Sequence, residues 1–145
     1  MRCACQRLLV ALWAGSLWSI GLLAAPLLFV ALPNRALAGI AARQLFMGVE
    51  YLGVICGLLL MILMRSAQGR WLSGFTSRLV SIMLIVTVVS LLVVDPWLDQ
   101  VRITHGAASG AFAWAHTLAL LVYLALCGLG LWLVLRHEPQ PVTEG

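Results

Sequence analysis

The chain has 145 residues, of which 63% are hydrophobic and 10% are charged, and its mean hydropathy is +1.04. Soluble domains contain about 45–50% apolar and about 25% charged residues, so this composition excludes a soluble protein with a polar surface. The formal net charge is +4, and all nine basic residues are arginines. We attribute this charge to membrane topology and to contact with anionic lipid headgroups, and it does not indicate binding of nucleic acid.

Four apolar stretches, separated by short polar segments, predict four helices within a single transmembrane domain that covers residues 1–145. A helix needs about 20 residues to cross the hydrocarbon core of a bilayer. The third stretch reaches that length when Asp95, Pro96 and Trp97 are included. The predicted helices cover about 8–32, 44–64, 79–97 and 111–135, and a short polar tail, 137–145, is expected to be disordered. The predicted fold is an all-α integral membrane four-helix bundle.

The arginines predict how the chain is threaded through the membrane. Six lie at the N-terminus, in the second loop or in the tail, namely Arg2, Arg7, Arg65, Arg70, Arg78 and Arg136. Only three lie on the opposite side, namely Arg35, Arg43 and Arg102. Positive residues favour the cytoplasmic side, so we expect both termini in the cytoplasm of a bacterium and the helices in its inner membrane. The first apolar run has 25 residues, which is longer than the core of a secretion signal and predicts a retained helix.

Glu50 is the one acidic residue inside the second apolar stretch, QLFMGVEYLGVICGLLLMILM. Counted from the cytoplasmic arginine of each helix at 1.5 Å per residue, Glu50 lies about 22 Å up, Asp95 about 26 Å, Pro26 about 28 Å and His116 about 30 Å. All four residues therefore fall in the outer third of the membrane. Ionisable residues at this depth are candidates for a functional site, because an unpaired charge there is costly.

Helical spacing indicates which residues share a face with Glu50. Arg43 lies two turns before it, and Gly53 and Gly57 follow it in a GxxxG pattern that allows close helix packing. On the fourth helix the same spacing joins His116 to Tyr123. We therefore predict that Glu50 faces the bundle interior, within reach of His116.

The candidate polar site comprises Glu50, His116, Asp95, Arg43 and Tyr123. A carboxylate in a low dielectric pairs with a cation, accepts hydrogen bonds or takes up a proton. One hypothesis is that this site binds or relays a proton or a small metal cation. The alternative is that the polar groups only lock the helices together, in a structural or assembly partner of a membrane complex with no transport or catalytic role.

Pro26 is expected to kink the first helix, because it has no N–H to donate to the carbonyl of Leu22. The freed carbonyl has two interpretations. It contributes to the polar site by binding water, a proton or a cation, or it belongs to a kink that serves only packing.

No catalytic motif is present, so the sequence does not favour an enzyme and no cofactor is expected. A mixed metal site of Glu50, Asp95, His105 and His116 is conceivable, as is haem, but the spacing of these ligands matches no defined motif. A four-helix bundle is thin, so a permeation path requires a homo-oligomer or a membrane partner protein in addition to the lipid bilayer.

The stretch from Leu12 to Phe46 resembles the opening of the bacterial domain of unknown function related to transmembrane protein 205. The resemblance rests on Trp13, Gly15, Ala25, Pro26, Phe29, Leu32, Pro33, Ala38, Gly39, Leu45 and Phe46. In the second half, Asp95-Pro96-Trp97 and the segment from Phe112 to Leu124 also resemble this family, whose histidine corresponds to His116 or to His105.

The resemblance implies a small four-helix inner-membrane protein without an assigned reaction. The eukaryotic relative is associated with resistance to a platinum drug, which points to soft-metal traffic. A weaker similarity extends to copper-resistance membrane proteins and to the membrane protoporphyrinogen oxidase. Both carry a histidine ahead of the first Trp-x-Gly, and this chain has none there.

Overall fold

The computed structural model of the chain describes residues 2–68 and 74–135. The predicted tail 137–145 lies outside these residues, as do Arg70 and Arg136. Four helical segments are long and apolar enough to cross a membrane, which confirms the prediction of four membrane-length helices. They cover Ala4–Ala31, Arg35–Arg65, Phe75–His105 and Gly110–Leu135.

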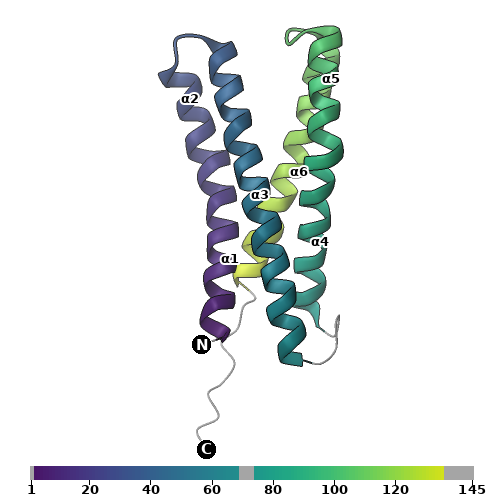
Figure 1. The fold of residues 1–145 in the computed structure, drawn as a ribbon. Helices are drawn as coiled ribbons and strands as arrows, with labels where there is room; N and C mark the ends of the chain where they lie inside the picture. The colour runs from purple at the N-terminus through teal and green to yellow at the C-terminus, as the bar shows by residue number, and fades with distance from the viewer. Residues whose placement is uncertain (1, 69–73, 136–145) are drawn as a thin grey trace, which may run out of the picture.

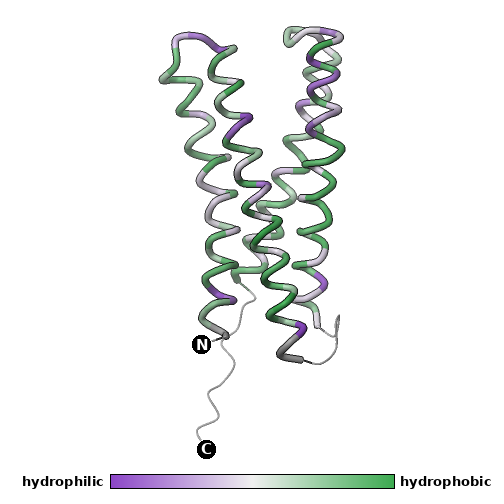
Figure 2. Tube along the Cα trace, in the orientation of Figure 1, coloured by the Kyte–Doolittle hydropathy of each residue, from purple (hydrophilic) through white to green (hydrophobic). Residues whose placement is uncertain are grey.

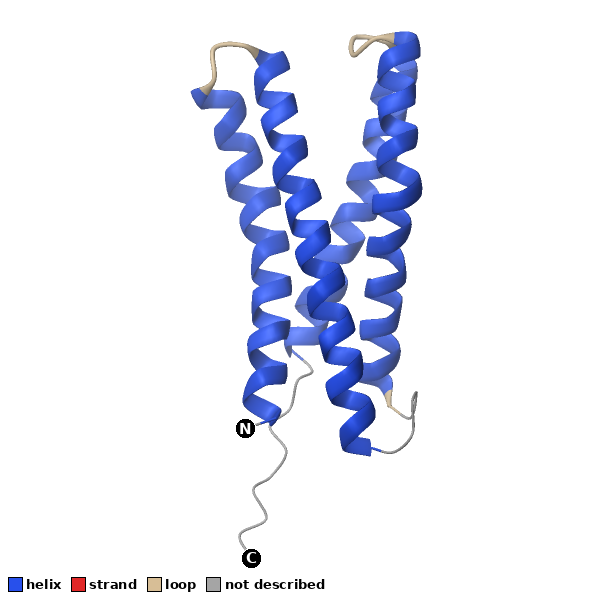
Figure 3. Cartoon of the chain, viewed as in Figure 1, coloured by secondary structure: helices blue, strands red, loops and turns tan. Residues whose placement is uncertain are grey.

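The first and third of these segments are each built from an α-helix, a short π-helix and a second α-helix (Figures 1 and 3). The elements in chain order are α1 (Arg2–Trp18), η1 (Ser19–Ala24), α2 (Ala25–Ala31), α3 (Arg35–Gln68), α4 (Phe75–Val89), η2 (Ser90–Val94), α5 (Asp95–His105) and α6 (Gly110–Leu135). Helix α1 begins, and α6 ends, at the same end of the bundle, drawn at the bottom of Figure 1 and called here the lower end.

The two long helices α3 and α6 run obliquely across the bundle, α3 at the front of Figure 1 and α6 behind it. Helix α3 packs on α2 near the upper end and on α1 and α4 lower down, whereas α6 packs on α5 near the upper end and on α4 and α1 lower down. No Cα atom of α3 lies within 8 Å of a Cα atom of α5 along their described lengths. The upper parts of α3 and α5 are separated in Figure 1, so contact between these two helices depends on their side chains.

Short polar turns at the upper end cap the helices that follow them. The Asn34 side chain accepts a hydrogen bond from the backbone N–H of Ala36 at 2.8 Å, and the Ser109 hydroxyl accepts one from Phe112 at 3.1 Å. Each satisfies an N–H group that the first turn of a helix leaves without a partner. Gly106 has a φ of 81°, a conformation that glycine adopts without strain, and it ends α5.

Two helices extend beyond their predicted bounds at the upper end. Helix α3 begins at Arg35 instead of near residue 44, and the third span continues through α5 to His105 instead of ending at residue 97. The prediction ended each helix where charged residues begin. Those charges lie on continuous helix, and Figure 2 shows hydrophilic sections within the upper parts of α3 and α5.

Each π-helix directly precedes an Xaa-Pro pair. In η1 the backbone N–H of Ala25 donates to Ile20, and in η2 the N–H of Asp95 donates to Ser90, so both bonds span five residues. Proline lacks an N–H, and the wider π turn lets the chain continue as a helix through Pro26 and Pro96. Near Pro26, where the sequence predicts a kink, the structure has a π segment one turn earlier, and Pro96 has an equivalent π segment that the sequence did not indicate.

The packed core lies toward the lower half of the bundle. Its largest fully buried side chains are those of Trp13, Cys56, Leu60, Val80, Met83 and Leu133. The GxxxG pair faces Trp13: a Cβ atom added to Gly53 would lie 2.6 Å from Trp13 Nε1, and one added to Gly57 would lie 3.2 Å from Trp13 Cη2. The two glycines provide the space that the indole ring occupies between α1 and α3.

Candidate functional site

Two acidic side chains from different helices meet inside the membrane-length region. Glu50 lies midway along α3, and Asp95 is the first residue of α5. Their carboxyl groups lie within hydrogen-bonding range of each other, and both residues are half-buried. Two ionised carboxylates have only acceptor atoms, so a hydrogen bond between them requires a proton on one of the two.

The η2 segment determines where Asp95 lies. An α-helix that continued regularly from α4 would place residue 95 about 100° away around the axis, because the π turn contains one more residue. The register shift in Ser90–Val94 brings Asp95 to the side of α5 that faces Glu50. Irregular helix of this kind often marks functional sites, and here it orients an acidic side chain.

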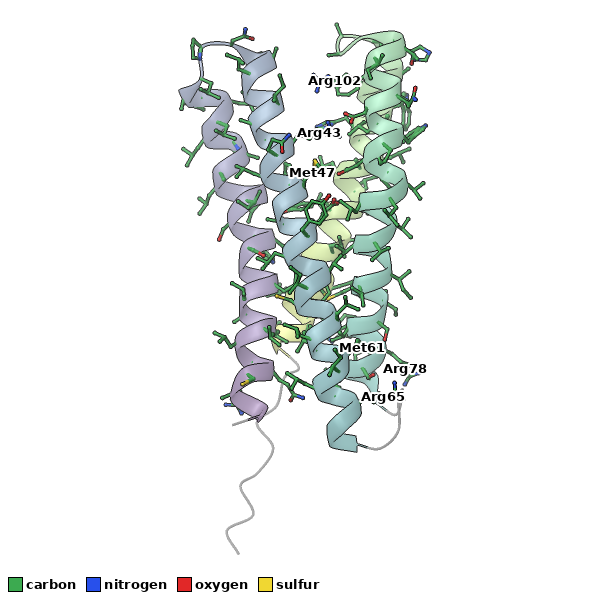
Figure 4. The ribbon with its side chains drawn as sticks, viewed as in Figure 1. Arg43, Met47, Met61, Arg65, Arg78 and Arg102 are labelled. Atoms are coloured by element: carbon green, nitrogen blue, oxygen red, sulfur yellow. The ribbon has the colours of Figure 1, made fainter. Side chains whose placement is uncertain are left out.

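An ion pair lies above the two carboxyl groups, closer to the upper end. Arg43 of α3 pairs with Asp99 of α5, and the two side chains are 38% and 29% exposed. Asp95 also lies close enough to Arg43 and Asp99 to feel their charges. Figure 4 shows Arg43 and Met47 on α3 and Arg102 on α5, with the two arginine side chains extending into the space between these helices.

The charges in this region balance when one proton is present. Three carboxyl groups, those of Glu50, Asp95 and Asp99, lie near Arg43, and Arg102 extends into the space between α3 and α5 nearer the upper end (Figure 4). With all three carboxylates ionised the group carries one negative charge in excess, and a single proton brings it to zero. Neutrality matters here because an uncompensated charge in a low dielectric is costly.

Tyr123 of α6 lies near Glu50, against the junction of α1 and η1. Its hydroxyl donates a hydrogen bond to the carbonyl of Leu17, at the junction of α1 and η1, and its ring meets Phe46 edge to face with centroids 4.9 Å apart. Gly21 makes room for this ring, since a Cβ atom there would lie 2.5 Å from Tyr123 Cε1. Tyr123 also lies within electrostatic range of Glu50.

Two buried polar atoms lack a hydrogen-bond partner among the described residues. They are Oε2 of Glu50 and Nε1 of Trp13. Gly53 contacts the Trp13 nitrogen and lies one turn after Glu50 on α3, so the unpaired acceptor and the unpaired donor lie at neighbouring levels. A buried polar atom without a partner costs about 1–3 kcal/mol, so each of the two requires an explanation.

The structure does not bring His116 to this cluster. His116 is exposed on the outside of α6, where its ring stacks on Phe112 with a centroid distance of 5.9 Å, and the buried residue at this level is its neighbour Ala115. The expectation that Glu50 lies within reach of His116 is therefore wrong. Spacing along α6 places His116 and Tyr123 on one face, but the obliquely crossing helix buries different faces at different levels.

Pro26 and His105 also lie apart from the acidic pair. Pro26 is exposed on α2, and His105 is exposed at the last residue of α5, where its Nδ1 lies 2.7 Å from the hydroxyl of Thr104. Among the described residues, no group of three or more His, Cys, Asp or Glu side chains has a geometry that could hold a metal ion. The acidic pair itself offers two carboxyl groups, with Arg43 close to Asp95.

The sequence analysis missed Asp99 and Trp13 as members of this region. Asp99 follows Asp95 by one helical turn, but the predicted end of the helix at residue 97 removed it from consideration. Trp13 enters the sequence analysis only among the residues that carry the family resemblance. The available signal for Asp99 was its spacing: Asp95, Asp99 and Arg102 repeat at intervals of four and three, as on one face of a helix.

Comparison with known proteins supplies a family. No curated protein and no solved structure matches the chain. One protein family does match, over residues 8–107, which is 100 of the 145 residues. The matched region contains both members of the acidic pair and the Arg43–Asp99 ion pair, and it ends before α6. The chain therefore belongs to the family described as a domain of unknown function, DUF4149.

Proposed function

We propose that the chain is a small membrane protein whose Glu50–Asp95 pair holds one exchangeable proton. The observation that carries the proposal is the approach of these two carboxyl groups to hydrogen-bonding range within two membrane-length helices. One shared proton supplies the donor that two carboxylates lack, and two interacting carboxyl groups then titrate as a unit.

A proton suits the site better than a metal cation. The Arg43 side chain lies close to Asp95 and pairs with Asp99, so the region already contains fixed positive charge. A metal ion would bring further positive charge to a site that offers it only two carboxyl groups. A proton needs one donor and one acceptor, and it leaves the carboxyl groups and arginines neutral as a group.

The proposed role is a proton-binding or proton-relay step within a homo-oligomer or a complex with another membrane protein. From the distribution of arginines we place the chain in a bacterial inner membrane with both termini in the cytoplasm, so the acidic pair lies toward the outer side. The relation to transmembrane protein 205 is a further proposal, which rests on the residues between Leu12 and Phe46.

Infrared spectroscopy of the purified protein in liposomes tests the shared proton. At pH 7 we expect a protonated-carboxyl C=O band that shifts in heavy water, as an exchangeable proton requires. Glu50→Gln and Asp95→Asn should each abolish this band, because each leaves a single carboxylate with an amide donor. The control His116→Gln should leave it unchanged. A spectrum without the band, or one in which both substitutions leave it intact, would overturn the proposal.

A purely structural role is the second candidate, and one observation favours it. The Cα atoms of α3 and α5 stay more than 8 Å apart, and the Glu50–Asp95 and Arg43–Asp99 pairs bridge the two helices. These pairs then serve to hold the upper end of the bundle together. This role predicts that Glu50→Gln changes only stability or assembly, and that acid tolerance of cells carrying the variant at normal membrane levels stays unchanged.

A further inference from the structure

A groove lies on the lower half of the bundle, between α1 and α6 and away from the acidic pair. It has a volume of about 610 Å³, within the range of about 300–1,000 Å³ that is typical of ligand pockets. Arg7 lies at one end and Trp18 at the other, and Ala11, Gly15, Leu131 and Val134 are among the residues between them. Its lining is apolar apart from Arg7 and the indole N–H of Trp18.

Small residues create the groove by letting the two helices touch without filling the space beside the contact. A Cβ atom added to Gly130 of α6 would lie 3.5 Å from the Cβ of Ala14, so the helices meet here. At Gly15 an added Cβ would meet no atom within 4 Å, so the space beside it is open. The Trp18 indole donates to the Cys127 carbonyl at 3.3 Å, which fixes the end wall of the groove.

The dimensions of the groove match one leaflet of a bilayer. Arg7 and Trp18 are eleven residues apart, or about 16 Å along α1 at 1.5 Å per residue. Half of a hydrocarbon core of about 30 Å is about 15 Å. The groove therefore extends from the headgroup level, where arginine is favoured, to near the middle of the membrane.

The charge of Arg7, at one end of the groove, indicates which kind of molecule binds there. Arg7 is exposed and forms no ion pair with a carboxylate among the described residues. Basic residues at the mouth of a pocket between transmembrane helices bind the headgroups of anionic lipids. A guanidinium binds a phosphate through two parallel hydrogen bonds, and the apolar lining suits an acyl chain.

We propose that this groove is a binding site for an anionic phospholipid, with an acyl chain along Ala11 and Gly15 and the phosphate at Arg7. A second copy of the chain is a poorer occupant. Pairing of two parallel copies through this face by a two-fold axis would place two Arg7 side chains at the same level, where like charges repel. The proposed site is independent of the proton proposed at the Glu50–Asp95 pair.

Native mass spectrometry of the purified full-length protein tests the site. Phosphatidylglycerol and phosphatidylcholine with identical acyl chains are added separately, and the bound fraction is measured. We expect the wild type to bind phosphatidylglycerol about tenfold more tightly, since the choline ammonium of phosphatidylcholine offsets the phosphate charge that Arg7 attracts. Gly15→Leu fills the groove and should abolish this preference. Arg7→Gln should reduce binding of phosphatidylglycerol to the level of phosphatidylcholine, and Arg7→Lys should retain part of the preference.

The matched control is Gly48→Leu, because an added Cβ atom at Gly48 also meets no atom within 4 Å and Gly48 does not line the groove. This variant should bind both lipids as the wild type does. Equal binding of the two lipids by the wild type, or equal behaviour of Gly15→Leu and Gly48→Leu, would overturn the proposal. Conversion of an oligomer to a monomer by Gly15→Leu, with lipid binding unchanged, would identify the groove as an interface between copies and would also overturn it.

Discussion

Glu50, midway along α3, lies within hydrogen-bonding range of Asp95, the first residue of α5. The two helices do not touch through their backbones, and the acidic pair is one of two polar bridges between them. Each carboxyl group depends on the other for its hydrogen bond. The effect of a substitution at either position on stability should therefore depend more on the hydrogen-bonding capacity of the new side chain than on its charge.

Glu50→Ala should lower the free energy of unfolding by about 1–3 kcal/mol, because it leaves the half-buried Asp95 without its partner. Glu50→Gln should cost less than about 1 kcal/mol, since the amide donates to the Asp95 carboxylate. Unfolding in mixed micelles of mild detergent and sodium dodecyl sulfate, followed by far-ultraviolet circular dichroism, measures both values. Equal losses in the two variants would contradict a hydrogen bond between these side chains.

The Arg43–Asp99 ion pair should show a small coupling energy, because both side chains are partly exposed. A double-mutant cycle with Arg43→Gln and Asp99→Asn should give about 0.5–1 kcal/mol, decreasing with added salt. The control cycle combines Arg35→Gln with Asp99→Asn and should be additive within about 0.5 kcal/mol. A coupling energy near zero for the first cycle would show that the pair does not bridge the helices.

Gly53→Ala should destabilise the protein by about 1–3 kcal/mol through overpacking, because the new methyl group would lie 2.6 Å from Trp13 Nε1. Gly48→Ala is the control, since a Cβ atom there meets nothing within 4 Å, and it should be neutral or slightly stabilising as alanine favours the helix. Thermal unfolding in detergent compares the two variants. Similar melting temperatures would mean that α1 and α3 pack less closely than the structure indicates.

Tyr123 and Gly21 should be coupled, because the glycine leaves space for the tyrosine ring. Tyr123→Phe should cost about 0.5–1.5 kcal/mol, through loss of the hydrogen bond to the Leu17 carbonyl. Gly21→Ala should destabilise the wild type but be tolerated when Tyr123 is also replaced by alanine. The readout is unfolding in mixed micelles. A Gly21→Ala effect that is the same in both backgrounds would rule out this contact.

His116→Leu should leave both stability and the infrared carboxyl band unchanged, since His116 is exposed on α6 and contacts Phe112 of the same helix. Its ring stacking on Phe112 contributes at most a few tenths of a kcal/mol. Loss of the carboxyl band in this variant would restore His116 to the polar site.

Hydropathy predicted the four membrane-length helices, because a bilayer requires about 20 apolar residues per span whatever the tertiary structure. Hydropathy did not predict the helix bounds at the upper end of the bundle correctly. Arg43 and Asp99 look like loop residues in a hydropathy profile, yet they lie on helices and pair with each other. A charge on a helix is tolerated when a partner neutralises it, and the partner comes from a helix that is distant in sequence.

The sequence by itself determined that Glu50 lies within a membrane-length helix, on the same face as Arg43, Gly53 and Gly57, because helical periodicity fixes which residues of one helix share a face. Only the tertiary structure decided that this face meets Asp95 and that His116 points outward. The rotation of one helix relative to another depends on packing and, here, on the π turn that reorients Asp95. Neither is encoded in the period of a single helix.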